Sequence, residues 1–268
     1  MSLLLADRFY IGDVSTFMML VKILKTDPEF CIAFDFGARR LDIESMLMAG
    51  VIGVGIRLVQ GTNAIIVHSP MCRTDRVTFR MDSSAFHQAI VVLNHIPYAY
   101  MSIGTNEEDD AICLYTYSKD HVNLGSAVVH SLNLEDHDTD FLVTNEDLRE
   151  VLPYDLMIEN PGTVWKSYIQ ASTIDTVIRY DSKTQRLTWE TQNQHTKISL
   201  YLPVSTQYSS DIRVCLLPSV LNVLRTVVQV TSKHMTTLSI SEDLPVRLFA
   251  RFDNDSFIRV YAGTKDDN

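Results

Sequence analysis

The hydrophobic and polar positions repeat one order four times along the chain of 268 residues. Each repeat begins with a short strand-like run, continues with apolar residues at helical spacing, and ends with three more strand-like runs. In the first repeat, Asp13 can cap a helix whose apolar stripe runs from Val14 to Leu24, and Pro28 ends it. In the third repeat, the pair Asn160-Pro161 is typical of a helix start. The pattern predicts helices over residues 13–25, 82–95, from 160 onward, and 218–231.

Runs of apolar and β-branched residues, separated by turn residues such as Gly37 and Gly50, predict the strands. Helices with one apolar stripe and sheets with one apolar face bury these faces against each other. We therefore expect an α+β fold with antiparallel sheets, built from four strand-helix-strand-strand-strand units. The predicted strands are residues 8–11, 30–36, 40–47, 51–58, 75–81, 98–103, 111–117, 127–134, 154–159, 173–180, 186–190, 196–203, 211–216, 235–240, 246–252 and 256–262.

The stretch from Leu132 to Pro153 interrupts this repetition near the middle of the chain. Between Glu135 and Glu150 it carries seven carboxylates against one arginine, and it has no helical or strand period apart from the apolar triplet Phe141-Leu142-Val143. We interpret it as a bridge over residues 135–153 between two similar domains, residues 1–134 and residues 154–268.

Composition restricts the possible functions. The net charge is −10, which argues against simple nucleic-acid binding, because such proteins usually display an excess of lysine and arginine. No apolar run approaches the ~20 residues of a membrane span, and the apolar start is too short for a secretory signal. The cysteines at 31, 72, 113 and 215 form no C-x-x-C pair, which favours reduced thiols and gives no spacing support for a metal site. We expect an intracellular protein without a membrane partner.

The charged residues are segregated. The outward faces of the predicted helices contain no aspartate or glutamate, although the chain has 33 acidic residues, most of them in turns. This distribution predicts a neutral-to-basic surface on an acidic molecule, and chance together with ordinary solvated helix faces is the alternative explanation. The outward polar positions are Ser15, Lys22, Lys25, His87, Gln88, Asn94, His95, Lys166, Ser167, Gln170, Ser219, Asn222, Arg225, Thr226, Gln229 and Lys233.

An enzyme is the competing class of function. The acidic cluster Glu107–Asp110 could suggest metal or acid–base chemistry, but its place between two strands favours a solvated hairpin turn. The sequence contains no P-loop, G-x-S-x-G or H-E-x-x-H motif. Gly50, Gly53 and Gly55 lead into a strand, unlike the glycines of a dinucleotide fingerprint. We expect no catalytic residues, no metal and no cofactor.

Several segments resemble one family. These are Asp211–Val214 with Leu217-Pro218, Met235–Leu248 with its Ser-x-x-x-Pro element, Phe257–Ala262, Leu41–Met46 and Cys72–Arg76. Together with the fourfold order and the acidic bridge, they resemble proliferating cell nuclear antigen (PCNA), the eukaryotic sliding clamp, along essentially the whole chain. Leu47 stands where the family has aspartate, Gly53 where it has an aliphatic residue, and Gly263 where it has proline. The bridge is longer than usual, and the second helix carries histidines in place of lysines, so the chain is similar to a divergent clamp.

The resemblance implies a DNA clamp (processivity) fold, with antiparallel sheets outside and helices inside a homotrimeric ring that encircles double-stranded DNA. It also reconciles the acidic charge with DNA, because a closed ring is retained by topology and needs few phosphate contacts. By matching positions, the DNA-facing residues are Lys22, Lys25, His87, His95, Lys166, Arg225 and Lys233.

The resemblance further implies that one strand of each subunit pairs with a strand of the next subunit, here residues 111–117 with residues 173–180. The interface residues would be Ile112, Cys113, Leu114, Tyr115, Thr176, Val177, Ile178 and Tyr180. A pocket beneath the bridge would take a short apolar and aromatic peptide turn. Its residues would be Met46, Val51, Phe141, Leu142, Val143, Pro245, Val260, Tyr261 and Ala262.

The partners implied by the family are DNA polymerase, the clamp loader and other proteins with a clamp-binding motif, in the nucleus or at a viral replication site. Two related alternatives stay open: a subunit of the heterotrimeric checkpoint clamp, and a monomeric viral polymerase processivity factor that binds DNA on an open face.

Overall fold

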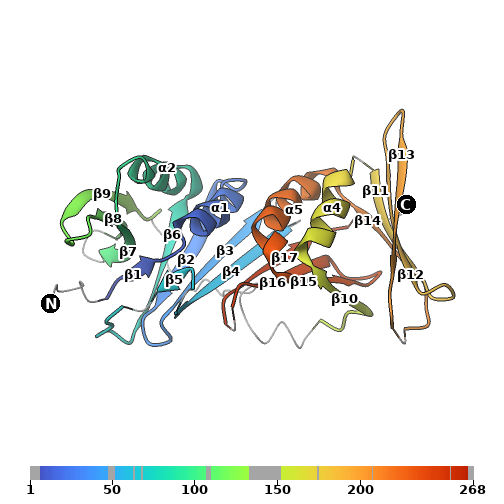
Figure 1. Ribbon diagram of the computed structural model, residues 1–268, viewed down its shortest axis with the longest axis horizontal. Coiled ribbons are helices and arrows are strands. Elements are labelled where there is room, and N and C mark those ends of the chain that lie inside the picture. The colour runs from blue at the N-terminus through green and yellow to red at the C-terminus, as the bar shows by residue number, and fades with distance from the viewer. Residues whose placement is uncertain are drawn as a thin grey trace. The chain divides into compact units, whose positions relative to one another are not determined.

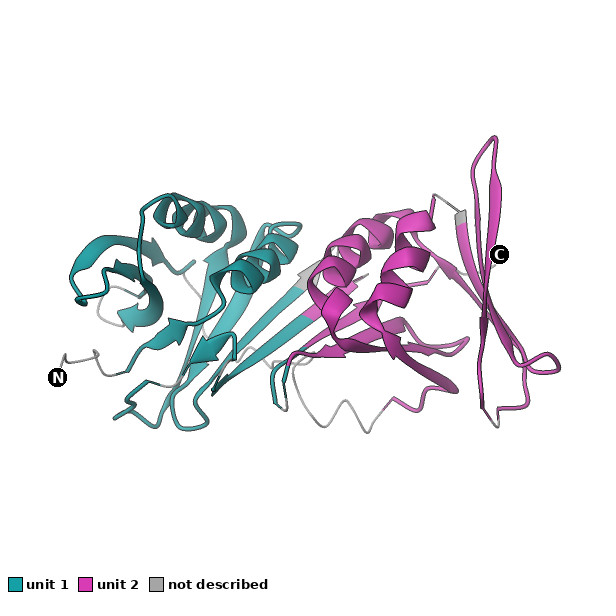
Figure 2. Ribbon diagram, viewed as in Figure 1, with its two compact units in different colours: residues 1–45, 55–144, 253–257 teal, residues 46–54, 145–252, 258–268 magenta. Residues whose placement is uncertain are grey.

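The computed structural model describes residues 7–47, 52–62, 64–67, 69–106, 110–132, 152–173, 175–206, 208–253 and 255–264. The chain divides into two compact units (Figure 2). Unit 1 comprises residues 1–45, 55–144 and 253–257, and unit 2 comprises residues 46–54, 145–252 and 258–268. Most of the predicted bridge lies outside the described residues, so the domain bounds 1–134 and 154–268 stay a prediction.

In unit 1, helices α1 and α2 lie on the same side of the strands (Figure 1). Two strand groups carry them: β1, β7, β8 and β9 are neighbours in that order, and β4, β3, β2 and β6 are neighbours in that order. The elements are β1 (Phe9–Ile11), α1 (Val14–Leu24), β2 (Glu29–Asp35), β3 (Arg40–Leu47), β4 (Ile52–Gly61), β5 (Ile66–Val67), β6 (Arg76–Asp82), α2 (Ser83–Asn94), β7 (Tyr100–Asn106), β8 (Ala111–Tyr117) and β9 (Asn123–His130).

Unit 2 repeats this arrangement. The order β10, β15, β16, β17 corresponds to β1, β7, β8, β9, and the separate sheet β13, β12, β11, β14 corresponds to β4, β3, β2, β6. The elements are β10 (Leu156–Pro161), α4 (Gly162–Ala171), β11 (Asp175–Asp181), β12 (Arg186–Gln192), β13 (Lys197–Pro203), β14 (Ile212–Leu216), α5 (Pro218–Val230), the 3₁₀ turn η1 (Thr231–Lys233), β15 (Met235–Ile240), β16 (Val246–Arg251) and β17 (Phe257–Ala262).

Local sequence explains where the helices begin. Asp13 accepts a hydrogen bond from the Thr16 backbone N–H at 3.0 Å, and Asp82 accepts one from Ala85, so each carboxylate satisfies an orphan donor of the first turn. Helix α5 instead starts with Pro218, whose missing N–H costs nothing there.

The core of each unit lies between its helices and its strands. Phe17 and Leu20 of α1 are fully buried in unit 1, and Trp165 of α4 is fully buried in unit 2. The indole N–H of Trp165 donates to the Thr236 carbonyl oxygen of β15 at 2.8 Å, which fixes α4 to the sheet without leaving a buried donor unpaired.

Three local predictions need correction. Asn160 is not a helix cap, because β10 continues to Pro161 and α4 begins at Gly162, whose N–H donates to the His234 carbonyl oxygen at 2.8 Å. A Cβ at Gly162 would collide with the Thr231 carbonyl oxygen, so the close approach of backbones sets this start. Strand β9 begins at Asn123 rather than at residue 127, and β5 was not predicted, since its two residues are too few for a visible alternation.

Candidate nucleic-acid and assembly surfaces

Helices α1 and α2 bring three of the predicted DNA-facing residues of unit 1 together. Lys22 and Lys25 are exposed on α1, and His87 is half-buried on α2. The pKa of His87 lies below its ordinary value because burial disfavours the imidazolium and because Lys25 and Lys22 repel its positive charge. The three side chains therefore share one electrostatic surface, and His95 is exposed at the end of α2.

In unit 2 the predicted cations differ from one another in their surroundings. Lys166 is half-buried and Lys233 is exposed. The Arg225 guanidinium is half-buried and donates to the Ser172 carbonyl oxygen at 2.5 Å, at the C-terminal end of α4. A cation at this end of a helix is favourable because backbone carbonyls carry partial negative charge there. Arg225 therefore joins α5 to α4, a structural role that the sequence pattern did not indicate.

The helices of the described chain carry no acidic residue. The sequences of α1, α2, α4 and α5 contain neither aspartate nor glutamate, as the outward faces predicted. Their exposed faces therefore place no carboxylate that would repel a phosphate backbone, although the whole chain is acidic. That these faces meet DNA stays a prediction.

The predicted interface strands are wrong, because both edges of each are already occupied within the chain. Strand β8 pairs with β7 and with β9, and β11 pairs with β12 and with β14. No backbone edge is left on either strand for a neighbouring subunit. Six of the eight predicted interface side chains are buried core, namely Ile112, Cys113, Leu114, Thr176, Ile178 and Tyr180, while Tyr115 and Val177 are half-buried.

Strands β9 and β13 are better candidates for assembly, because each stands at the end of its strand order. On β9, Leu124 and Val128 are 42% and 52% exposed. On β13, Tyr201 is 57% exposed. An exposed apolar strand at a sheet edge is normally protected by pairing or covering.

The predicted partner pocket is only partly described. The side chain of Met46 and all of Val51 and residues 141–143 lie outside the described residues. Val260 and Ala262 are completely buried and belong to the core, whereas Pro245 and Tyr261 are half-buried. The pocket therefore stays a prediction.

Tyr154 is a residue of this region that the sequence reasoning missed. Its hydroxyl donates to the Pro245 carbonyl oxygen at 2.7 Å. Burial raises the pKa of Tyr154, and the neighbouring Tyr261 adds to this effect, so the phenol stays protonated and keeps donating. Tyr154 thereby holds the turn before β16 in place.

Among the described residues, no group of three histidine, cysteine, aspartate or glutamate side chains could hold a metal ion. Residues 107–109 of the acidic cluster lie outside the described residues, and Asp110 is at a turn with φ of 46°. No disulfide joins any of the four cysteines. None of the described helices is long and apolar enough to cross a membrane.

Neither a protein-family model nor a curated protein matches the chain. Solved structures do match the fold of the chain. PCNA from Thermococcus kodakaraensis superposes with a TM-score of 0.71 at 8% identity, covering 96% of this chain and 99% of that chain. The PCNA2–PCNA3 complex from Sulfolobus tokodaii gives a TM-score of 0.71 at 11% identity, with the same coverage. The chain therefore has the fold of PCNA clamps, and the predicted α+β clamp fold is confirmed.

Proposed function

We propose that this protein is a DNA sliding clamp, a polymerase processivity factor that encircles double-stranded DNA and recruits replication and repair proteins. The observation that carries the proposal is the PCNA fold, which is shared over 96% of the chain. The role involves no catalytic step. Its place would be the nucleus or a viral replication site.

The helix surfaces support the DNA part of the proposal. A clamp that slides needs a surface that attracts phosphates weakly and holds no fixed phosphate. Lys22 and Lys25 provide a small positive surface in unit 1 beside His87, whose lowered pKa favours the neutral imidazole, and the described helices add no carboxylate that would repel DNA.

Ring closure would use the two free edges. We propose that β13 of one subunit pairs with β9 of the next, so that the exposed Tyr201, Leu124 and Val128 become covered. This replaces the predicted pairing of residues 111–117 with residues 173–180. Each subunit offers one edge of each kind, so the contact is head-to-tail and closes into a ring when the rotation per subunit allows it.

The test is the mass of the purified chain in solution, followed by retention on DNA. A homotrimer has about three times the chain mass of 30.4 kDa, or ~91 kDa. After loading, a ring should stay on a closed circular duplex and leave when that duplex is cut. Its DNA association should depend only shallowly on salt, whereas a log–log slope near −10 would indicate tight phosphate binding and contradict encirclement.

A heteromeric clamp is the second candidate, and one observation favours it: the Sulfolobus tokodaii neighbour is a complex of PCNA2 with PCNA3. In that case the chain alone has the mass of one or two subunits, and a ring forms only with different partner chains. A single-chain mass together with direct binding to linear DNA would favour the monomeric processivity factor instead.

A further inference from the structure

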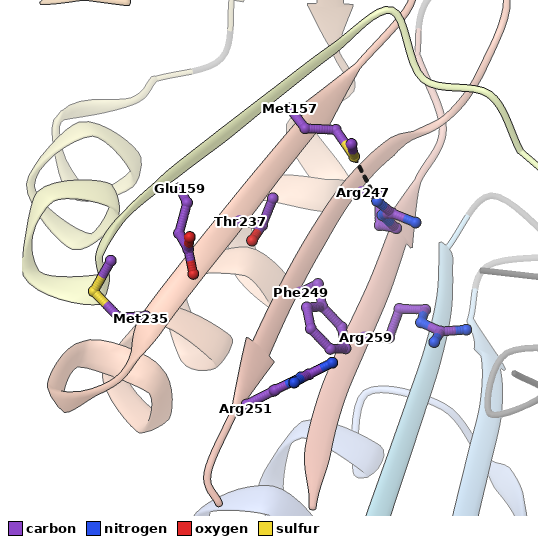
Figure 3. Close-up of a pocket in the computed structure, with 8 residues that line it drawn as sticks. All are labelled: Met157, Glu159, Met235, Thr237, Arg247, Phe249, Arg251 and Arg259. Carbon is purple, nitrogen blue, oxygen red and sulfur yellow. Dashed lines mark hydrogen bonds between the residues drawn. The ribbon is translucent and has the colours of Figure 1, made fainter. Parts of the chain in front are cut away.

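The sheet of unit 2 has a hollow of about 590 Å³ on the face opposite to its helices (Figure 3). Residues on alternate positions of four strands line it, because successive side chains of a strand point to opposite faces. Glu159, Thr237 and Phe249 form one row across β10, β15 and β16. The lining residues are Met157, Glu159, Met235, Thr237, Arg247, Phe249, Arg251 and Arg259.

Arg247 is held in place at one end of the hollow. Its side chain is only 7% exposed, and Nη2 donates to the Ser239 hydroxyl at 2.9 Å and to the Met157 sulfur at 3.4 Å. Its guanidinium also lies 4.6 Å from the centre of the Tyr154 ring. The conformation of the Arg247 side chain is therefore already fixed in the unbound protein, which lowers the entropic cost of binding a ligand.

Two further arginines flank Phe249. The guanidinium carbons of Arg251 and Arg259 each lie 5.7 Å from the centre of its ring. Arg259 is 1% exposed and Arg251 is exposed, so one cation lies deep and the other lies at the rim. Phe249 between them is half-buried and offers an apolar surface within the same hollow.

The lining has an excess of positive charge. It contains three arginines and a single carboxylate, that of Glu159, in a chain whose net charge is −10. The two methionines are strongly exposed, Met157 by 62% and Met235 by 51%, and their flexible side chains can adapt to an apolar ligand group.

We propose that this hollow binds an acidic peptide segment of a partner protein. A carboxylate of the peptide would pair with Arg251, because the planar guanidinium matches a carboxylate with two parallel hydrogen bonds. A second carboxylate would accept from Nη1 of Arg247, whose Nε and Nη2 already donate to Ser239. An apolar peptide side chain would lie against Phe249 and the methionines. A nucleic-acid backbone fits less well, because the apolar surfaces of Phe249 and the methionines have no counterpart on the backbone.

The site goes beyond the proposed clamp function and does not depend on it. All eight lining residues belong to unit 2, and none of them is a residue of the predicted partner pocket. The two sites also differ in expected charge: the bridge carries seven carboxylates between Glu135 and Glu150 and would favour basic peptides at the predicted pocket, whereas this hollow would favour acidic ones. A chain that stays monomeric would keep the hollow.

The experiment measures fluorescence anisotropy of a labelled peptide of alternating glutamate and leucine around one phenylalanine, with the full chain. Arg251→Glu should weaken binding about tenfold or more. Arg251→Lys should weaken it less, because lysine keeps the positive charge but lacks the two parallel N–H donors of the guanidinium. Glu159→Gln should strengthen binding about twofold, since it removes the only carboxylate of the lining. Lys183→Gln, in the exposed turn between β11 and β12, is the matched control and should bind as the wild type does.

Three results would overturn the proposal. The first is equal peptide affinity of the wild type and Arg251→Glu. The second is binding of single-stranded oligothymidylate as tight as that of the peptide and equally sensitive to Arg251→Glu, which would assign the hollow to nucleic acid. The third is peptide binding that arises only after the acids of residues 135–150 are changed to amides, which would assign the hollow to the chain's own bridge. Because Arg251 is exposed, its variants should fold normally, and circular dichroism checks this.

Discussion

Changing Val128 to aspartate tests the proposed assembly through β9 most directly. Val128 is 52% exposed in the single chain, so covering it removes about half of a valine side chain from water. Full burial of a valine contributes about 1.5–3 kcal/mol, which makes the wild-type contribution about 1 kcal/mol per interface. An aspartate in the same place loses this contribution and must also leave water without a partner, at a cost of several kcal/mol more.

The expected loss is therefore about 3–5 kcal/mol per interface, or about a hundredfold to several thousandfold in the dissociation constant. Light scattering coupled to gel filtration, at low micromolar chain concentration, should show the mass of one chain for Val128→Asp. Under the same conditions we expect the wild type at ~91 kDa, three times 30.4 kDa.

Val92→Asp is the matched control. Val92 has nearly the same exposure, 56%, but it lies on helix α2 and not on a strand edge. The Val92→Asp variant should keep the mass of the wild-type assembly. This result would separate loss of the β9 edge from a general effect of added negative charge. A wild-type mass for Val128→Asp, or dissociation by both variants alike, would refute the assignment of β9.

Four further predictions concern individual side chains. Replacing Lys22 and Lys25 by glutamine should raise the pKa of His87 toward its ordinary value of 6.5, because it removes two repelling charges. NMR titration of the imidazole measures this pKa. An unchanged value would show that the lysines do not act on His87. Because the folded-state pKa of His87 is lowered, stability should decrease as the pH falls through about 6.5, and His87→Gln should remove that part of the pH dependence. Gly162→Ala should lower the free energy of unfolding by about 1–3 kcal/mol, since its Cβ would meet the backbone of η1. Urea titration measures this change, and a cost near zero would show that the two backbones do not approach so closely. Asp42→Asn should cost about 3–5 kcal/mol in the same assay, because this 1%-exposed carboxylate pairs with the arginines around it, and a loss below ~1 kcal/mol would show that the network is dispensable.

Helices were the part of the fold that could be predicted well from the sequence. An amphipathic helix shows its period, its cap and its end within one local segment, as Asp13 to Leu24 do. The start of α4 is the exception. At Asn160-Pro161 the local signal for a helix start is strong, yet pairing of β10 with β15 keeps both residues in the strand. Tertiary pairing overrides a local preference here.

Strand order could not be predicted, and the error at β8 shows why. Residues Ala111–Tyr117 form a nearly continuous apolar run, and apolar runs without alternation are typical of strands that are buried on both sides. The resemblance implied that this run pairs with a neighbouring subunit. The strand that ends the sheet is instead β9, which has fewer apolar residues and contains Gly125 and Ser126. Which strand is last in a sheet depends on pairings between distant segments, and these leave no periodic trace in the sequence.

The distribution of acidic residues links the two proposed surfaces. A ring of three such chains would carry a net charge of −30, three times −10, which opposes both DNA binding and association of the subunits. Yet acids are missing from all the described helices, and they are missing as well from β9 and β13, whose only basic side chains are His130 and Lys197. Repulsion between acids placed elsewhere is screened over about 8 Å at physiological salt, while a carboxylate inside either contact would act at full strength. The same placement of charge therefore permits an acidic chain to meet phosphates on one surface and another copy of itself on the other.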